Sequence, residues 1–205
     1  MWWPALALAL ETPAAPSDPD AQGAPRLAAP PLLGIALGGF AGLGVETTAD
    51  GTHGQATAGG ELALRVSYGQ LVGCVSVSEL VASRASTWCV LGGAVLPFVG
   101  WADLDLSAGF ARRRYESDDT RYGPNGYTVE ASALAARAGL SARAGDVAGV
   151  RFGAFFELQH DLDTRRVPWA YRLSEDVTVT GKTAVGGTTV SLAVRLAADF
   201  ELLGR

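Results

Sequence analysis

Residues Thr188–Leu202 read TTVSLAVRLAADFEL, and this stretch decides the fold. Its even-numbered positions are mainly apolar, whereas its odd-numbered positions are small, polar or charged, as at Arg195 and Asp199. A period of two residues is typical of a β-strand and not of a helix. Strands usually have about five or six residues, so this one is unusually long. Its length and its single apolar face predict a strand that crosses a membrane as part of a β-barrel.

Seven other segments alternate in the same way. They occupy residues 32–46, 61–68, 71–80, 87–96, 101–115, 127–143 and the stretch that begins at Val150. We expect short connections after the second, fourth and sixth strands and long ones after the first, fifth and seventh, the first being a polar loop over residues 47–60. This asymmetry is typical of bacterial outer-membrane barrels. The prediction is an all-β, eight-stranded, antiparallel up-and-down transmembrane β-barrel.

A soluble β-sandwich is the alternative fold, because its strands also alternate and its charged face would meet water. Strand length and loop asymmetry favour the barrel.

The register of the barrel's last hairpin can be predicted, because residues that lie opposite each other must share a face. A turn at residues 174–176 meets this condition, since it pairs Phe156 with Val194 and Val150 with Phe200. A local hairpin turning at residues 181–182 is the competing arrangement.

The first 31 residues differ in composition from the rest. Residues 1–10, MWWPALALAL, resemble the apolar core of a secretory signal that lacks its positive n-region; a short apolar tail is the alternative interpretation. Residues 11–31 are rich in proline, which is typical of an extended linker. We therefore expect residues 1–31 to be a signal-like segment and linker, and residues 32–205 to form the barrel.

Charged side chains of both signs gather in the strand phase that would face the barrel interior. An eight-stranded barrel is only wide enough for side chains to fill. A balanced set of arginines and carboxylates would form ion pairs there and plug the lumen, and a path for ions or protons is the alternative. The predicted lumen charges are Glu61, Arg65, Asp103, Asp105, Arg113, Arg137, Arg143, Arg151, Glu157, Arg195 and Asp199, and Asp161 and Glu201 share their phase.

Cys74 and Cys89 are the two cysteines of the chain, and both fall in the inward phase. A tight hairpin centred near residues 81–82 would place them opposite each other. Because an exported protein meets an oxidising compartment, we expect a disulfide, provided that the cross-strand geometry allows it. Two free thiols packed in the lumen are the alternative.

Neither a catalytic site nor a metal or cofactor site is expected. His160 lies beside Asp161 and Asp163, but neighbouring residues of a strand point to opposite faces, so His160 and Asp161 make a poor dyad. The glycines of the first strand do not form a dinucleotide-binding motif. A net charge of −5 gives no reason to expect nucleic acid as a partner.

Over residues 32–202 the chain resembles the small, eight-stranded outer-membrane β-barrel proteins of diderm bacteria. Their insertion signal is similar to the spacing of Arg195, Ala197, Phe200 and Leu202, with Ala197 in place of a glycine and with a chain that continues to Arg205. The resemblance implies the outer membrane, its lipid and the barrel-insertion machinery as surroundings and partners. It does not imply one shared activity. We expect a monomer.

Recognition of an extracellular ligand would fall to the external rim, because the lumen is narrow and the wall meets lipid. The richest external element is the last hairpin, about residues 163–186. It carries residue types that often anchor interfaces, and its edges could accept a partner strand; these residues are Arg165, Arg166, Trp169, Tyr171 and Arg172. Alternatively, the two aromatic residues belong to a membrane girdle.

The predicted function is a non-enzymatic barrel with a structural or surface-interaction role. A soluble binding module and a lipid-modifying barrel enzyme are the alternatives.

Overall fold

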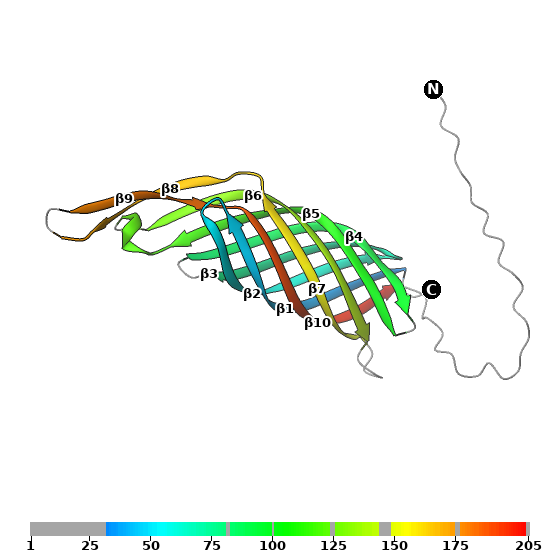
Figure 1. The fold of residues 1–205 in the computed structure, drawn as a ribbon. Coiled ribbons are helices and arrows are strands. Elements are labelled where there is room, and N and C mark those ends of the chain that lie inside the picture. Colours follow the sequence, from blue (N-terminus) through cyan, green and yellow to red (C-terminus); the bar gives the residue numbers. More distant parts are fainter. Residues whose placement is uncertain are drawn as a thin grey trace, which may run out of the picture.

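A computed structural model describes residues 32–80, 83–99, 101–123, 126–143, 149–174 and 177–203. Eight long antiparallel strands close into a ring in the order β1-β10-β7-β6-β5-β4-β3-β2 (Figure 1). The ring confirms the predicted barrel and excludes the sandwich. Its strands are β1 Leu33–Thr48, β2 Gly51–Val66, β3 Gly69–Leu80, β4 Ser83–Val99, β5 Ala102–Ser117, β6 Tyr127–Arg143, β7 Val150–Asp161 and β10 Thr188–Leu203.

The expected signal and linker, residues 1–31, lie outside the described residues. Among the residues that are described, no helix is long and apolar enough to cross a membrane.

The register shows how far the strands are staggered around the ring. Paired residues lead from Thr52 in β2 through Thr47, Thr188, His160, Leu134, Phe110, Val90 and Gly73 back to β2 at Leu62, ten residues further along. Such a stagger requires strands tilted by roughly 35–45° to the barrel axis. A tilted strand crosses a bilayer in about 9–11 residues. The strands here have 12 to 17 residues and therefore extend beyond the membrane.

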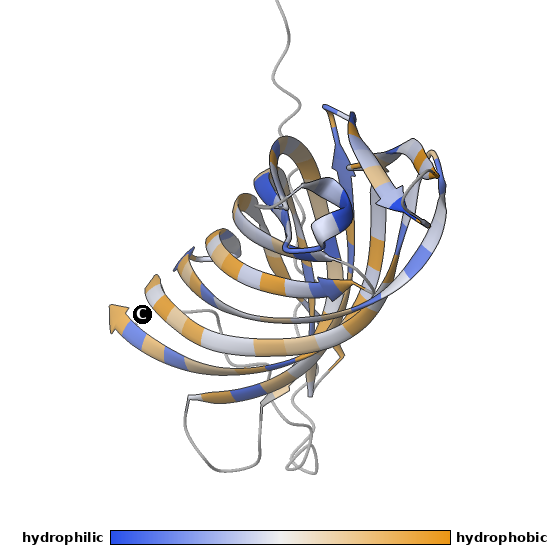
Figure 2. Cartoon of the chain, turned by 90° about the vertical axis from the view of Figure 1, so that its left-hand side faces the viewer, coloured by the Kyte–Doolittle hydropathy of each residue, from blue (hydrophilic) through white to orange (hydrophobic). Residues whose placement is uncertain are grey.

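The ring separates an apolar outer face from a polar interior. Large apolar side chains on the outer face are exposed, with Leu43 at 72% and Phe110 at 68%, whereas the inward Leu91 is fully buried. Figure 2 shows the resulting alternation of hydrophobic and hydrophilic residues along the strands. An exposed apolar surface of this extent would be unfavourable in water and is solvated by lipid. The protein is therefore a transmembrane barrel.

The predicted polar loop over residues 47–60 is wrong. β1 and β2 continue as a paired hairpin as far as Thr48 and Gly51, and a turn at residues 49–50 joins them. The small and polar residues of this part of β2, such as His53 and Gly54, are exposed. Their polarity marks the part of the hairpin that stands above the membrane and not the end of a strand.

The turn of the last hairpin lies where it was predicted, but the strands below it are out of register with that prediction. β8 (Arg165–Arg172) pairs with β9 (Thr178–Val185) in a separate two-stranded sheet whose last pair is Arg172 with Thr178. The competing turn at residues 181–182 is therefore wrong. In the barrel, Phe156 faces Leu192 and not Val194.

The shift of two residues arises where the chain leaves the barrel. Four residues, 161–164, separate the pair His160–Thr188 from the pair Arg165–Val185 on the outgoing side, and two residues, 186–187, do so on the returning side. Gly186, with φ at 90°, makes the sharper return possible. Because the shift is even, every side chain keeps its predicted face.

Candidate functional site

The lumen is filled by three groups of ion pairs, and the middle one centres on Glu61. Its Oε2 accepts from Arg137 Nη1 at 3.0 Å and its Oε1 from Arg195 Nη1 at 3.1 Å. Arg137 also binds Glu157, and Arg195 Nη2 lies 2.9 Å from Asp105 Oδ2. All five side chains are buried. Alternation along β2, β5, β6, β7 and β10 directs each of them to the barrel axis.

Aromatic rings close the same level of the lumen. Phe40 and Phe155 meet edge to face with their centroids 5.4 Å apart. The Arg137 guanidinium lies 5.1 Å from the Phe40 centroid and 4.6 Å from that of Phe155. Cation–π contacts of this kind gain strength where water is excluded, so the rings and the ion pairs form one packed plug.

The group at the end of the barrel where β1 begins and β10 ends links Arg65, Arg151, Asp103 and Asp199. Arg65 Nη1 lies 2.7 Å from Asp199 Oδ1. Arg151 pairs with both Asp199 and Asp103. Each arginine is therefore neutralised at the mouth of the barrel.

The group at the external end centres on Arg113, which is 1% exposed. Its Nη2 lies 3.2 Å from Glu46 Oε1 and its Nη1 lies 3.2 Å from Asp161 Oδ2. The Tyr115 hydroxyl lies 2.7 Å from Glu46 Oε1 and 2.5 Å from Asp161 Oδ2. Thr189 accepts from Arg113 Nη1 at 3.1 Å. The external mouth is thus closed by hydrogen bonds from four strands, β1, β5, β7 and β10.

All the predicted lumen residues except Arg143, whose side chain lies outside the described part, take part in these ion pairs. Glu46 and Tyr115 belong to the lumen ion pairs and hydrogen bonds but were not among the predicted lumen residues. The signal was present, because both continue the inward phase of their strands. It was missed because β1 was expected to end at Glu46 and β5 at Tyr115.

The disulfide between Cys74 and Cys89 is confirmed. It joins directly paired residues of β3 and β4, whose Cα atoms are 5.1 Å apart. Both residues are buried, and Cys74 Sγ accepts from Arg137 Nη2 at 3.3 Å. The bond therefore lies inside the plug, against the ion pairs of the middle level.

The external hairpin forms a ribbon, β8–β9, that extends past the end of the barrel (Figure 1). Arg165 and Arg166 are exposed at its base, and Tyr171 and Arg172 lie near its far end. The ring of Trp169 covers Gly181 on the paired strand, where a Cβ atom would lie 2.5 Å from Trp169 Cζ2. Trp169 and Tyr171 therefore lie on a sheet separate from the barrel wall.

The ribbon is fastened to the barrel at its base. Val185 is buried in a cluster with Tyr115, against which Val167 also packs. The backbone N–H of Ala184 donates to Asp50 Oδ2, and the Tyr122 hydroxyl lies 3.3 Å from Thr183 Oγ1. Tyr122 belongs to the short helix η1 (Thr120–Tyr122) in the β5–β6 connection. The base is therefore part of the packed structure.

The cap of η1 is ionic. Asp119 accepts from the Nε and the backbone N–H of Arg121, at 2.8 Å and 2.9 Å. These hydrogen bonds lower the pKa of Asp119 below its usual value, since they favour its charged form. The loop beside the ribbon thus keeps its cap at neutral pH.

Among the residues that the structure describes, the side-chain contact of His160 is with a threonine and not with a carboxylate. Its Nδ1 lies 2.9 Å from Thr188 Oγ1 on the outer face, whereas Asp161 faces the lumen at 2% exposure. Within the described ranges, no group of three or more His, Cys, Asp or Glu residues is placed to hold a metal ion.

Comparison with known proteins identifies the fold. No family model matches the sequence, and no curated protein does. Neisserial surface protein A superimposes with a TM-score of 0.60 at 9% identity, covering 80% of this chain and 96% of that one. The N-terminal barrel domain of Pseudomonas aeruginosa OprF gives a TM-score of 0.52 at 13% identity, with coverage of 80% and 96%. The chain therefore has the fold of the small outer-membrane β-barrel proteins.

Proposed function

We propose that the protein is a non-enzymatic outer-membrane β-barrel with a plugged lumen, which contacts partners outside the cell through the β8–β9 ribbon. The observation that carries the proposal is the ribbon itself, a two-stranded sheet beside a closed barrel, whose outer edges pair with no further strand in the described part of the chain. The apolar outer face and the shared fold support the outer-membrane location.

The far end of the ribbon has the surface of a contact site. Its apolar side chains are exposed, with Tyr171 at 51%, Leu173 at 63%, Val177 at 48% and Val179 at 42%. Clustered exposed apolar residues beyond the membrane usually mark an interaction surface. The two strand edges offer backbone donors and acceptors to a partner strand.

The middle of the ribbon is protected from non-specific pairing. Pro168 and Lys182 lie opposite each other. Proline lacks a backbone donor, and both residue types are common on edges that avoid aggregation. Strand addition should therefore be confined to the far end, from Trp169 to Val179.

The test shortens the ribbon without disturbing its base. Replacing residues 168–182 by Asn-Gly keeps Val167 and Val185, which pack on the barrel, and Asn-Gly favours a tight hairpin. We expect the shortened protein to enter the membrane fraction and to keep its heat-modifiable gel mobility. Adhesion of whole cells to protein-coated and abiotic surfaces should fall to that of cells without the protein.

A full-length control carries Thr178→Ser and Thr180→Ser on the same ribbon and should adhere normally. Undiminished adhesion of the shortened protein would refute the role of the ribbon. Recovery of the full-length protein as a soluble monomer without detergent would refute the outer-membrane location.

A further inference from the structure

The outer face of the barrel is uneven around its circumference. Among the described barrel strands, the outward-pointing Asp, Glu and Arg side chains lie on β3–β6, near their external ends. The outward positions of β1, β2, β7 and β10 carry none. The charged side chains form three ion pairs, Arg84–Glu79, Arg112–Glu130 and Arg114–Glu116.

These charges begin where the apolar band ends. Along the outward face of β5, Arg112 follows Phe110; on β6, Glu130 lies two outward positions above Leu134. A charge on the lipid-facing side costs little near the interface, in contrast to the midplane. Trp88, paired with Arg112 across β4–β5, lies at the same boundary, as tryptophans at membrane interfaces do. The charged patch is therefore level with the headgroups of the external leaflet.

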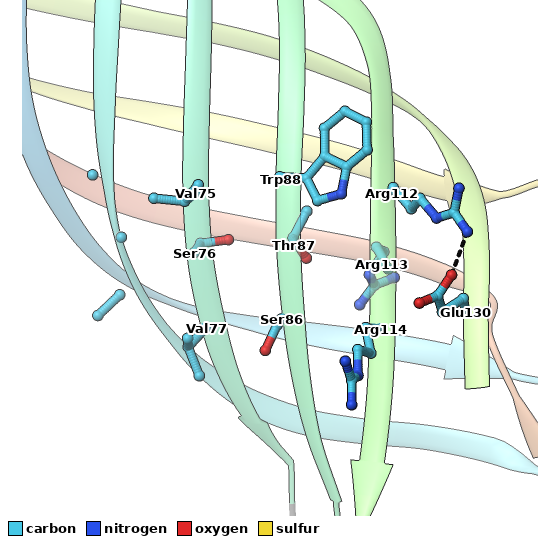
Figure 3. A pocket seen from close by; sticks show the side chains of 13 residues that line it. Val75, Ser76, Val77, Ser86, Thr87, Trp88, Arg112, Arg113, Arg114 and Glu130 are labelled. Carbon is cyan, nitrogen blue, oxygen red and sulfur yellow. Dashed lines mark hydrogen bonds and ion pairs between the residues drawn. The ribbon is translucent and has the colours of Figure 1, made fainter. Parts of the chain in front are cut away.

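A hollow lies in the wall at this level. Its lining includes Ala58, Gly60 and Val75 from β2 and β3. Trp88, Arg112, Arg114 and Glu130, from β4, β5 and β6, also line it (Figure 3). The small residues of β2 leave the space open, and Trp88 stands beside it. One part of the lining is thus apolar, and the other carries two arginines that lie beside the carboxylates Glu130 and Glu116. An amphipathic anion that displaces these carboxylates from the guanidinium groups would fit such a lining.

The arginines retain hydrogen-bonding capacity toward such a ligand. Arg112 binds Glu130 through Nη2, and Arg114 Nε lies 2.5 Å from Glu116 Oε1. A guanidinium has five N–H donors, and the two side chains are 53% and 55% exposed. Arginine pairs with phosphate through two parallel hydrogen bonds. The glutamates hold the guanidinium groups in place and also compete with the ligand.

We propose that this hollow binds a phosphorylated lipid of the external leaflet. Its phosphate would bind Arg112 and Arg114, and an acyl chain would lie along Trp88 and the small residues of β2. The site is on the opposite side of the wall from the lumen and does not involve the ribbon, so it is independent of the proposed adhesion.

The test uses the purified full chain in zwitterionic micelles and diphosphorylated lipid A as the probe. Binding is measured by native mass spectrometry and by tryptophan fluorescence. Arg112→Gln with Arg114→Gln should weaken binding at least about tenfold, the effect of losing one or more charged hydrogen bonds. Arg165→Gln with Arg166→Gln removes the same charge from the ribbon and should leave the affinity unchanged.

Glu130→Gln gives a second, opposite expectation. It removes the competing carboxylate beside Arg112 and should tighten binding. Added salt should weaken binding to the wild type, because the contact is electrostatic. If the double arginine variant fails to fold, the Glu130→Gln variant and the salt series still test whether the hollow binds lipid A.

Three results would overturn the proposal. They are equal binding by the double arginine variant, equal binding of dephosphorylated lipid A, and an affinity that neither Glu130→Gln nor salt alters.

Discussion

At Glu61, a single carboxylate serves two arginines from different strands, β6 and β10. Both of its oxygens accept, from Arg137 and Arg195, and none of the three side chains is more than 9% exposed. Removing one partner of a buried ion pair leaves an uncompensated charge, which costs about 3–5 kcal/mol. Glu61→Gln should therefore lower the free energy of unfolding by roughly that amount, measured by urea titration of the barrel in micelles.

The matched control is Glu79→Gln, which removes a carboxylate of the same type from an exposed pair with Arg84. Exposed pairs contribute about 0–1 kcal/mol. If the two variants unfold at the same urea concentration, the lumen ion pairs do not stabilise the barrel in the way argued here.

The burial of Cys74 and Cys89 predicts that the disulfide resists reduction in the folded barrel. The two residues are 5% and 3% exposed, inside the plug. Dithiothreitol without denaturant should leave the disulfide intact, so that a maleimide reagent labels neither cysteine. Dithiothreitol in urea should reduce the bond and yield two labelled cysteines. Cys74→Ser serves as the control, with a single thiol in every condition. Two labelled thiols in the folded, reductant-treated wild type would contradict the observed burial.

At this scale, the inward phase of each strand could be predicted from sequence, because a period of two assigns every residue to a face. That is why Arg137 and Glu157 were expected in the lumen. Which inward residues meet was not predictable, since partners such as Glu61 and Arg195 lie 134 positions apart. Their pairing depends on the stagger of the whole ring.

At the scale of the strand, two adjacent glycines of β4 differ sharply. A Cβ atom at Gly93 would lie 2.0 Å from the carbonyl oxygen of Leu106 and 2.6 Å from the Cα of Ser107. At Gly92 it would meet nothing within 4 Å. Gly93 faces inward, where the tightly curved wall brings β5 close, and Gly92 faces outward.

Gly93→Ala should therefore destabilise the barrel by about 1–3 kcal/mol through overpacking. Gly92→Ala should be neutral or slightly stabilising, because alanine is less costly than glycine inside a strand. Urea titration of the two variants side by side checks both. Equal stability would mean that β4 and β5 separate freely at Gly93.

The hairpin of β7 and β10 shows why register is harder to predict than strand position. The turn between β8 and β9 could be placed from the polar residues near position 175. The pairing of Phe156 with Leu192 could not be predicted. The connection from β7 to β8 has two more unpaired residues than the connection from β9 to β10. Alternation does not detect a shift of two, since it leaves every face unchanged.

At the scale of the molecule, pairing of the first and last strands closes the sheet into a barrel. β1 pairs with β10 along 15 residues, so no barrel strand keeps a free edge. The sequence pattern could predict closure, because eight alternating strands with one apolar face have no other way to satisfy their edges in lipid. It could not predict that β8 and β9 would stand apart from the ring, since their composition resembles that of a barrel strand near its external end.

The same closure governs whether the lumen conducts. Three levels of ion pairs cross it, and at the middle level Arg137 packs against Phe40 and Phe155. An ion would have to separate paired charges that are buried from water, and the narrow eight-stranded barrel, filled by side chains, has no room for a hydrated path. In planar bilayers at neutral pH we therefore expect no steady single-channel current from the wild type. Phe155→Ala removes one of the two phenylalanine rings of the plug without unpairing a charge. If packing seals this level, the variant should admit water and show a small, flickering current. A reproducible, ion-selective current through the wild type would show that the ion pairs line a path and do not close it.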